Sequence, residues 1–170
     1  MTDVDLRADC SRCAAMCCVA FHFDRSAEFG FDKRAGEPCA NLADTAGGGC
    51  RIHARLGEAG FGGCVLYDCH GAGPAVTQGL FGGRSWQTEP ALLEPMMAAF
   101  LEVERAHKLL VVLAQARTLS LSPTDRERLD TLTAAVREAA ARAQPVERLE
   151  AEVGVFLRGL RAYVAGRRLA

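Results

Sequence analysis

The second half of the chain carries apolar residues at the spacing of amphipathic helices. Between residues 87 and 169 they recur at alternating intervals of four and three, which places them along one face of a helix. The pattern predicts three helices. Their buried faces are expected to consist of Met96, Phe100, Val103, His107, Leu110 and Ala114, then Leu129, Leu132, Val136, Ala139 and Ala143, then Val146, Leu149, Val153, Phe156, Leu160 and Val164.

Prolines and a polar cap indicate where these helices begin. Pro90 and Pro95 belong near the start of the first helix, where a missing N–H is harmless. Residues 122–125, Ser-Pro-Thr-Asp, predict an N-cap, an N1 proline and a first-turn acid for the second. Pro145 begins the third. Three amphipathic helices with short links predict an antiparallel bundle.

The first half of the chain has a different composition. Residues 1–85 hold all eight cysteines and fourteen of the seventeen glycines. Glycine costs about 1 kcal/mol per helical position, so we expect one short helix followed by loops, turns and a small strand. Metal ligation is the usual way to hold such a segment. The predicted fold is mainly α, with a cysteine-rich, metal-ligated module (1–85) packed on an antiparallel three-helix bundle (86–170).

Four cysteines lie within nine residues near the N-terminus: Cys10, Cys13, Cys17 and Cys18. On a helix, positions 10, 13 and 17 share one face, because residues three and four apart are neighbours there. We therefore expect these three thiols to form one helical stripe and to ligate a metal. The adjacent Cys17 and Cys18 are expected to point in different directions, which makes them poor disulfide partners for each other.

Further candidate ligands follow along the first half. Cys50 and His53 are separated by two residues, a gap that lets a short turn present both to one ion. Cys64 and Cys69 flank residues 65–68, an expected strand or turn. Thiolates and imidazoles suit zinc, iron and iron–sulfur centres, whereas calcium and magnesium prefer oxygen. The predicted metal ligands are Cys10, Cys13, Cys17, Cys18, Cys39, Cys50, His53, Cys64 and Cys69.

The spacing leaves the metal open between zinc and an iron–sulfur cluster. Structural zinc prefers paired Cys-x2-Cys knuckles, whereas several cysteines along one segment with a remote fourth are typical of iron–sulfur binding. Two four-ligand sites are arithmetically possible. Among the other histidines, His70 is a candidate ligand or a hydrogen-bond donor to one, and His22 is a weaker candidate. His107 lies on the buried face of a helix, where we expect it to be partly buried with a local partner.

Charge and hydropathy limit the partners and the cellular location that we expect for this protein. A formal net charge of −1 argues against a general nucleic-acid binder. The longest apolar run, residues 109–114, is too short for a membrane span, and the polar, acidic start does not resemble a signal peptide. We therefore expect a cytoplasmic protein whose reduced thiols favour metal over a disulfide framework. Its expected partners are a metal ion or cluster and another protein, with neither nucleic acid nor membrane.

Three functional classes stay open: a metal-dependent scaffold or partner-binding protein, an iron–sulfur redox or sensor protein, and a metal- or thiol-dependent enzyme or enzyme accessory. The sequence carries no dinucleotide fingerprint, phosphate loop or nucleophile elbow. A Cys69–histidine nucleophile lacks a marked base or oxyanion hole. Arg12, Arg51 and Arg55 are predicted to offset the thiolate charge, because they lie close to cysteines in the sequence.

The run Cys10-x2-Cys13-x3-Cys17-Cys18 with its later cysteines resembles the CxxCxxCC zinc- or iron-chelating (YkgJ-like) family, with one extra residue before the Cys-Cys pair. A closer likeness is to the cysteine-rich N-terminal region of actinobacterial pentapeptide-repeat proteins, although the repeats themselves are missing. The resemblance implies metal chelation and a cytoplasmic location, and it supplies no enzymatic assignment. The matching pieces are residues 9–13, 16–20, 32–33, 38–42, 50–53, 60–69, 71–73 and 81–86.

Overall fold

The computed structural model describes residues 4–43 and 48–165, with side chains as far as residue 163. The chain is mainly helical, as predicted. Its α-helices are α1 (Met16–Ala20), α2 (Gly62–Leu66), α3 (Ala72–Pro74), α4 (Leu93–Ala116), α5 (Pro123–Ala141), α6 (Glu147–Gly159) and α7 (Arg161–Ala165). The described residues also form the 3₁₀ turns η1 (Cys10–Arg12), η2 (His53–Arg55) and η4 (Pro90–Leu92), and the π-helix η3 (Ala75–Leu80).

Extended pairing is confined to two isolated β-bridges in the cysteine-rich half. Phe23 pairs with Lys33 and Leu42 with Cys50, and neither pair belongs to a strand within the described ranges. Among the same residues, no helix has the length and apolar character that a membrane crossing requires.

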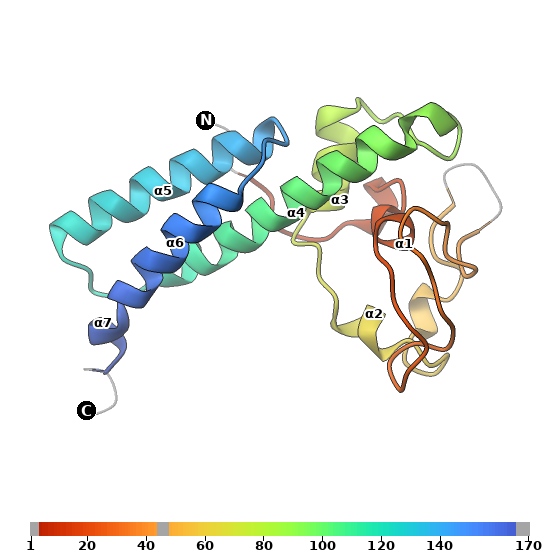
Figure 1. Ribbon diagram of the computed structural model, residues 1–170, viewed down its shortest axis with the longest axis horizontal. Helices are drawn as coiled ribbons and strands as arrows, with labels where there is room; N and C mark the ends of the chain where they lie inside the picture. The colour runs from red at the N-terminus through yellow and green to blue at the C-terminus, as the bar shows by residue number, and fades with distance from the viewer. Residues whose placement is uncertain (1–3, 44–47, 166–170) are drawn as a thin grey trace.

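The helices α4, α5 and α6 pack on one another around a shared core (Figure 1). Leu113, Leu129 and Leu132 are buried in it. The predicted cap at the start of α5 is confirmed, because the Ser122 hydroxyl accepts a hydrogen bond from the Asp125 N–H (3.1 Å) and a proline occupies the first turn. The capped start fixes the turn that brings α5 back along α4.

The predicted faces differ from the observed ones where a helix changes its packing partner. The buried face of α4 ends on Leu113 and Ala116, whereas the predicted Ala114 is exposed. The first half of α4 is buried against the cysteine-rich half and its second half against α5 and α6, so the buried face is not one straight stripe. This is why a regular spacing extrapolated from Met96 gives the wrong final residue.

The third predicted helix is divided in two. The chain leaves regular helix at Leu160 (φ −78°, ψ 0°), immediately after Gly159, and α7 follows. Val164, predicted on the same face, lies outside the described side chains. Ala143 is also outside the helix for which it was predicted, because α5 ends at Ala141 and Ala143 takes a left-handed backbone conformation (φ 47°).

The cysteine-rich half packs against the first half of α4. A second core joins Met16 and Val19 of α1 to Met96 and Phe100 of α4. Trp86 closes this core, and its indole N–H donates to the Ala14 carbonyl (2.8 Å). In Figure 1 the loops around α1 and α2 lie at one end of the molecule, opposite α5 and α6. Helix α4 thus contributes to both cores.

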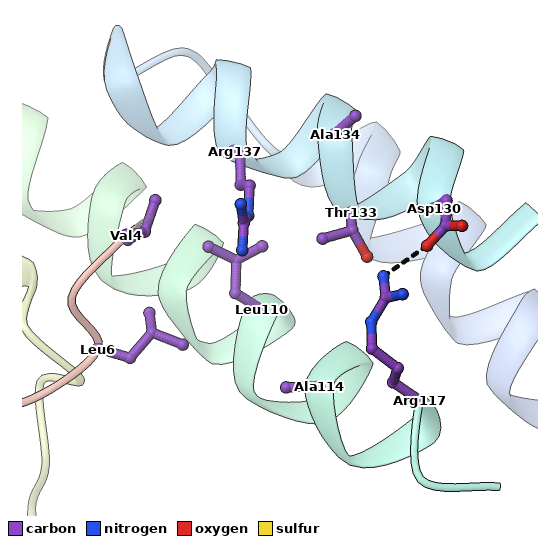
Figure 2. A pocket seen from close by; sticks show the side chains of 9 residues that line it. All are labelled: Val4, Leu6, Leu110, Ala114, Arg117, Asp130, Thr133, Ala134 and Arg137. Carbon is purple, nitrogen blue, oxygen red and sulfur yellow. Dashed lines mark hydrogen bonds and ion pairs between the residues drawn. The ribbon is translucent and has the colours of Figure 1, made fainter. Parts of the chain in front are cut away.

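The N-terminal segment crosses from the cysteine-rich half to the helical half, where it lines a cavity between α4 and α5. Figure 2 shows Val4 and Leu6 of this segment beside Leu110 of α4, at a cavity of about 270 Å³. An ion pair between Arg117 of α4 and Asp130 of α5 (2.6 Å) closes one end of the cavity. The segment that leads into the first cysteine is therefore anchored on the helical half.

Residues 65–68 do not form a strand. The helix α2 covers Gly62–Leu66, and an extended residue, Tyr67, follows it. Its two glycines allow a close approach of the chain: a Cβ on Gly63 would lie 2.2 Å from the Phe29 ring. The short helix forms here because the turn that carries Phe29 packs directly on its backbone, an interaction that the glycine run does not reveal.

Candidate metal centre

The first cysteine cluster does not lie on one helix, so the predicted stripe is wrong. Cys10 is in the turn η1, Cys13 is extended (φ −117°, ψ 137°), and Cys17 is in α1. Ala15 interrupts the run with a left-handed backbone conformation (φ 53°). The relation between positions 10, 13 and 17 is therefore set by a bend in the chain rather than by helical periodicity.

Tertiary contacts hold this bend. The Ala14 N–H donates to the Thr77 hydroxyl of η3 (3.0 Å), and the Ala14 carbonyl accepts the Trp86 indole N–H (2.8 Å). Both partners lie more than sixty residues away along the chain. Because buried backbone groups must find partners, these two contacts satisfy the N–H and the carbonyl of Ala14, which lies between η1 and α1.

One group of thiols surrounds Gly73 of α3. The Sγ atoms of Cys13 and Cys69 both lie within 4.0 Å of the point where a Cβ on Gly73 would stand. Burial raises the pKa of Cys13 to about 12, with smaller contributions from the charges of Cys17, Cys69 and Cys10. The Cys10 Sγ also lies 3.7 Å from Nε2 of His53. The bend thus brings three thiols and one imidazole into the same region.

A second group consists of Cys39, Cys50 and Cys64. Burial raises the pKa of Cys50, and it raises that of Cys64 to about 11; the charge of Cys39 contributes to both. Cys50 is held by its bridge to Leu42, and the Leu42 N–H in turn donates to the Cys39 carbonyl (2.9 Å). Two thiols that are eleven residues apart therefore share one small backbone framework.

Cys17 lies between the two groups. Its charge acts on Cys10 of the first group and on Cys50 and Cys64 of the second. Its own pKa is raised by a hydrogen bond with the adjacent thiol of Cys18 and by burial. The thiols of Cys17 and Cys18 therefore meet, whereas the sequence led us to expect that they point apart. Both belong to the five-residue helix α1.

All eight cysteines are free thiols. The raised pKa values mean that the affected thiols are protonated at neutral pH, so a metal would have to displace their protons. They also argue against an activated nucleophile, which needs a depressed pKa. Two sulfurs already accept backbone hydrogen bonds: Cys13 from the Met16 N–H (3.5 Å) and Cys39 from the Asn41 N–H (3.4 Å). Such N–H···S contacts stabilise thiolate ligands in metal and cluster sites.

The donor chemistry fits zinc or an iron–sulfur cluster, because the groups consist of thiols with one imidazole. The arrangement is not yet that of a ligated ion. Within the described part of the chain, no three histidine, cysteine or carboxylate side chains meet in positions that would hold one metal. Ligation therefore requires thiols inside each group to rotate toward a common point.

The remaining histidines have different surroundings. His107 is buried, and its Nδ1 lies 2.6 Å from the His70 carbonyl, so its partner is distant in sequence rather than local. Burial lowers the pKa of His107. The His70 side chain faces Asp68, with Nδ1 to Oδ2 at 3.6 Å, and His22 is exposed. The structure therefore gives His107 a packing role against the turn that carries Cys69.

Several residues of this region escaped the sequence analysis. Lys33 is buried beneath the end of α1, whereas the three arginines expected near the thiolates, Arg12, Arg51 and Arg55, are exposed. Tyr67 donates from its hydroxyl to buried Glu104 of α4 (3.4 Å) and so ties the Cys64–Cys69 segment to that helix. The partners of Lys33 are backbone carbonyls, which no spacing rule identifies. Its place among phenylalanines, in the run Phe-Gly-Phe-Asp-Lys of residues 29–33, is the one available signal.

Comparison with known sequences gives one relative of this region and of the helices that follow. The chain is 36% identical over 160 residues to "Uncharacterized protein YybG" of Bacillus subtilis (strain 168), an alignment that covers 90% of this chain and 56% of that protein. The chain thus spans about half the length of the curated relative it matches. No family model and no solved structure matches the chain.

Proposed function

We propose that the cysteine-rich half of this protein binds metal through thiolate ligands. The observation that carries the proposal is the presence of eight free thiols, from four separate segments of the chain, in one half of the molecule, with the charge of Cys17 acting on Cys10, Cys13, Cys50 and Cys64. Free thiols at this density oxidise and exchange unless they are ligated. In the reducing, cytoplasmic setting that we propose, metal binding accounts for so many free thiols in one region.

A structural role for the metal follows from how this half is built. Between α1 and α2 the residues that the structure describes form turns, one 3₁₀ turn and two isolated bridges. The ligands lie at the joints of this framework, so ligation would connect the loops to α1 and α3. In such modules the free energy of metal binding contributes directly to folding. We propose the arrangement as a metal-ligated module docked on an antiparallel three-helix bundle through α4 and Trp86.

Zinc is the metal that the first group favours, because Cys10 and His53 form a mixed sulfur–nitrogen pair beside Cys13 and Cys69. Three thiolates and one imidazole are a common structural zinc set. An iron–sulfur cluster is the second candidate, and the placement of Cys17 favours it. Cys17 with Cys10, Cys13 and Cys69 supplies four thiols, the number that a cubane cluster takes.

The proposed biological role is that of a metal-dependent scaffold or partner-binding protein. The resemblance to the YkgJ-like chelating family supports metal chelation and does not point to a particular reaction. The raised pKa values of Cys13 and Cys64 argue against either thiol as an activated nucleophile. A redox or sensor role belongs to the iron–sulfur alternative and would accompany a coloured, oxygen-sensitive protein.

Substitution of Cys13, with a matched core variant, tests the proposal. Cys13→Ser should lower the metal content and unfold the cysteine-rich half, because it removes a ligand from the group around Gly73. The control is Val19→Ala, which creates a cavity in the same core at a fully buried position. It should cost about 2 kcal/mol of stability and leave the metal content unchanged.

Metal content by elemental analysis and unfolding by circular dichroism separate the two effects. Loss of metal in Cys13→Ser alone supports ligation. Equal and full metal content in both variants would show that Cys13 does not ligate, and equal loss in both would show that the metal depends on packing rather than on this thiol.

A further inference from the structure

Lys33 holds a buried positive charge beneath the end of α1. The residue is 7% exposed, and its ammonium donates three hydrogen bonds, to the carbonyls of Val19 (3.2 Å), Phe21 (2.5 Å) and Arg34 (3.1 Å). A β-bridge to Phe23 fixes the lysine backbone as well. All three N–H groups of the ammonium are therefore used, and its position is fixed from both ends of the side chain.

Three thiols and one carboxylate are the groups whose negative charge would stabilise this ammonium. They are, in order, Cys39, Cys18, Glu37 and Cys17. Burial lowers the pKa of Lys33, because water is kept away from the charge. A buried cation is costly unless an anion compensates it. Besides Glu37, the groups able to supply that anion are Cys39, Cys18 and Cys17 of the candidate metal centre.

Backbone contacts hold the ammonium and the thiols in one frame. The Val19 carbonyl that accepts from Lys33 also accepts from the Gly36 N–H (2.9 Å), and the Cys39 N–H donates to the Cys18 carbonyl (2.9 Å). The segment 33–39 is thereby tied to the end of α1 at two adjacent peptide groups. These bonds fix the backbone of residues 33–39 relative to the end of α1, so the ammonium stays beside the residues that carry the thiols while the thiols themselves can rotate.

We infer that Lys33 is a positioning residue of the metal centre, whose fixed positive charge offsets the thiolates of Cys17, Cys18 and Cys39 when they bind metal. The inference rests on the proposed function. A zinc ion bound by three thiolates and one imidazole carries one formal negative charge, and one bound by four thiolates carries two. A compensating cation inside the protein lowers the cost of burying that charge. Lys33 takes the role that the sequence suggested for Arg12, Arg51 and Arg55, because it is buried and they are exposed.

The test compares Lys33→Gln, which keeps a hydrogen-bond donor and removes the charge, with Lys33→Arg, which keeps the charge. Zinc affinity is measured in the full chain by competition with a chromophoric chelator, and Co²⁺ replaces zinc for spectroscopy. Lys33→Gln should weaken zinc binding by about tenfold or more, because the attraction between one positive charge and nearby thiolates in a partly dehydrated site corresponds to about that change in affinity. Its thiolate-to-cobalt charge-transfer band should move to longer wavelength, because loss of the cation raises the energy of the sulfur electrons.

Lys33→Arg should retain both the affinity and the band position of the wild-type protein. Phe23→Leu, a neutral change next to the ammonium, is the control for loosened packing and should leave the band where it is. A Lys33→Gln protein with wild-type affinity and band position would overturn the inference while the proposed function stands. Should Lys33→Gln fail to fold, a Lys33→Arg protein with a shifted band and tenfold weaker binding would overturn it instead. A wild-type chain that takes up neither zinc nor cobalt would reject the proposed function itself.

Discussion

A methyl group added at Gly73 tests whether Cys13 and Cys69 act together. Gly73 lies in α3 between the two sulfurs, and its Cβ would stand 2.5 Å from the Cys13 Sγ and 3.2 Å from the Cys13 Cβ. The conflict is with the base of a short side chain, which cannot swing away as a long one could. Gly73→Ala should therefore push Cys13 away from Cys69 and open the first thiol group.

The expected cost follows from two opposing effects. Overpacking a buried site costs about 1–3 kcal/mol, and replacing glycine by alanine in a helical position returns about 1 kcal/mol. The net loss in the free energy of unfolding is about 0–2 kcal/mol before any effect on the metal. If the metal is bound through Cys13 and Cys69, the metal-loaded protein should lose more than the chelated one.

Urea unfolding of loaded and chelated protein, with elemental analysis of each, measures both quantities. Gly79→Ala is the matched control, because a Cβ at this exposed position in η3 meets nothing within 4 Å. Gly79→Ala should change the free energy of unfolding by no more than about 1 kcal/mol and leave the metal content unchanged. A Gly73→Ala protein with wild-type stability and full metal content would refute the placement of the two sulfurs.

Three further substitutions test the supporting framework. Trp86→Phe removes the indole N–H from the buried Ala14 carbonyl and should cost about 1–3 kcal/mol in urea unfolding; a change below about 0.5 kcal/mol would contradict the role given to this contact. Ser122→Ala removes the cap of α5 and should cost about 1 kcal/mol, which Ser122→Asp should largely restore. Burial lowers the pKa of His107, so the stability that the neutral imidazole contributes is present above the unfolded pKa of 6.5 and is lost as the pH falls toward the folded pKa. His107→Gln should therefore flatten the decline in the free energy of unfolding between about pH 7.5 and 5.5. An unchanged pH dependence would contradict this reasoning.

The helical half could be predicted closely because its signals are local. The Ser122 cap, the first-turn prolines and the 4-3 spacing from Met96 to Leu110 act within one helix and need no knowledge of distant partners. The prediction was wrong where packing changes along a helix, at Ala114, and where a helix is divided, at Leu160.

The candidate centre was predictable in its donors and not in its geometry. Cysteine counting finds the thiols, but the bend at Ala15 depends on Thr77 and Trp86, which lie more than sixty residues away. Lys33 is hidden for a related reason, since its acceptors are backbone carbonyls that any sequence would supply. Distant contacts, rather than the helical period, bring Cys10, Cys13 and Cys17 together.

Metal analysis of the protein purified anaerobically, without added zinc or iron, tests the central proposal most directly. We expect firmly bound metal: zinc in a colourless protein, or iron and sulfide in equal amounts in a brown one. Chelation should then unfold the cysteine-rich half, while the helical signal of α4, α5 and α6 remains, because their apolar core requires no ion. A metal-free protein that is fully folded, with all eight thiols freely alkylated, would contradict the proposal.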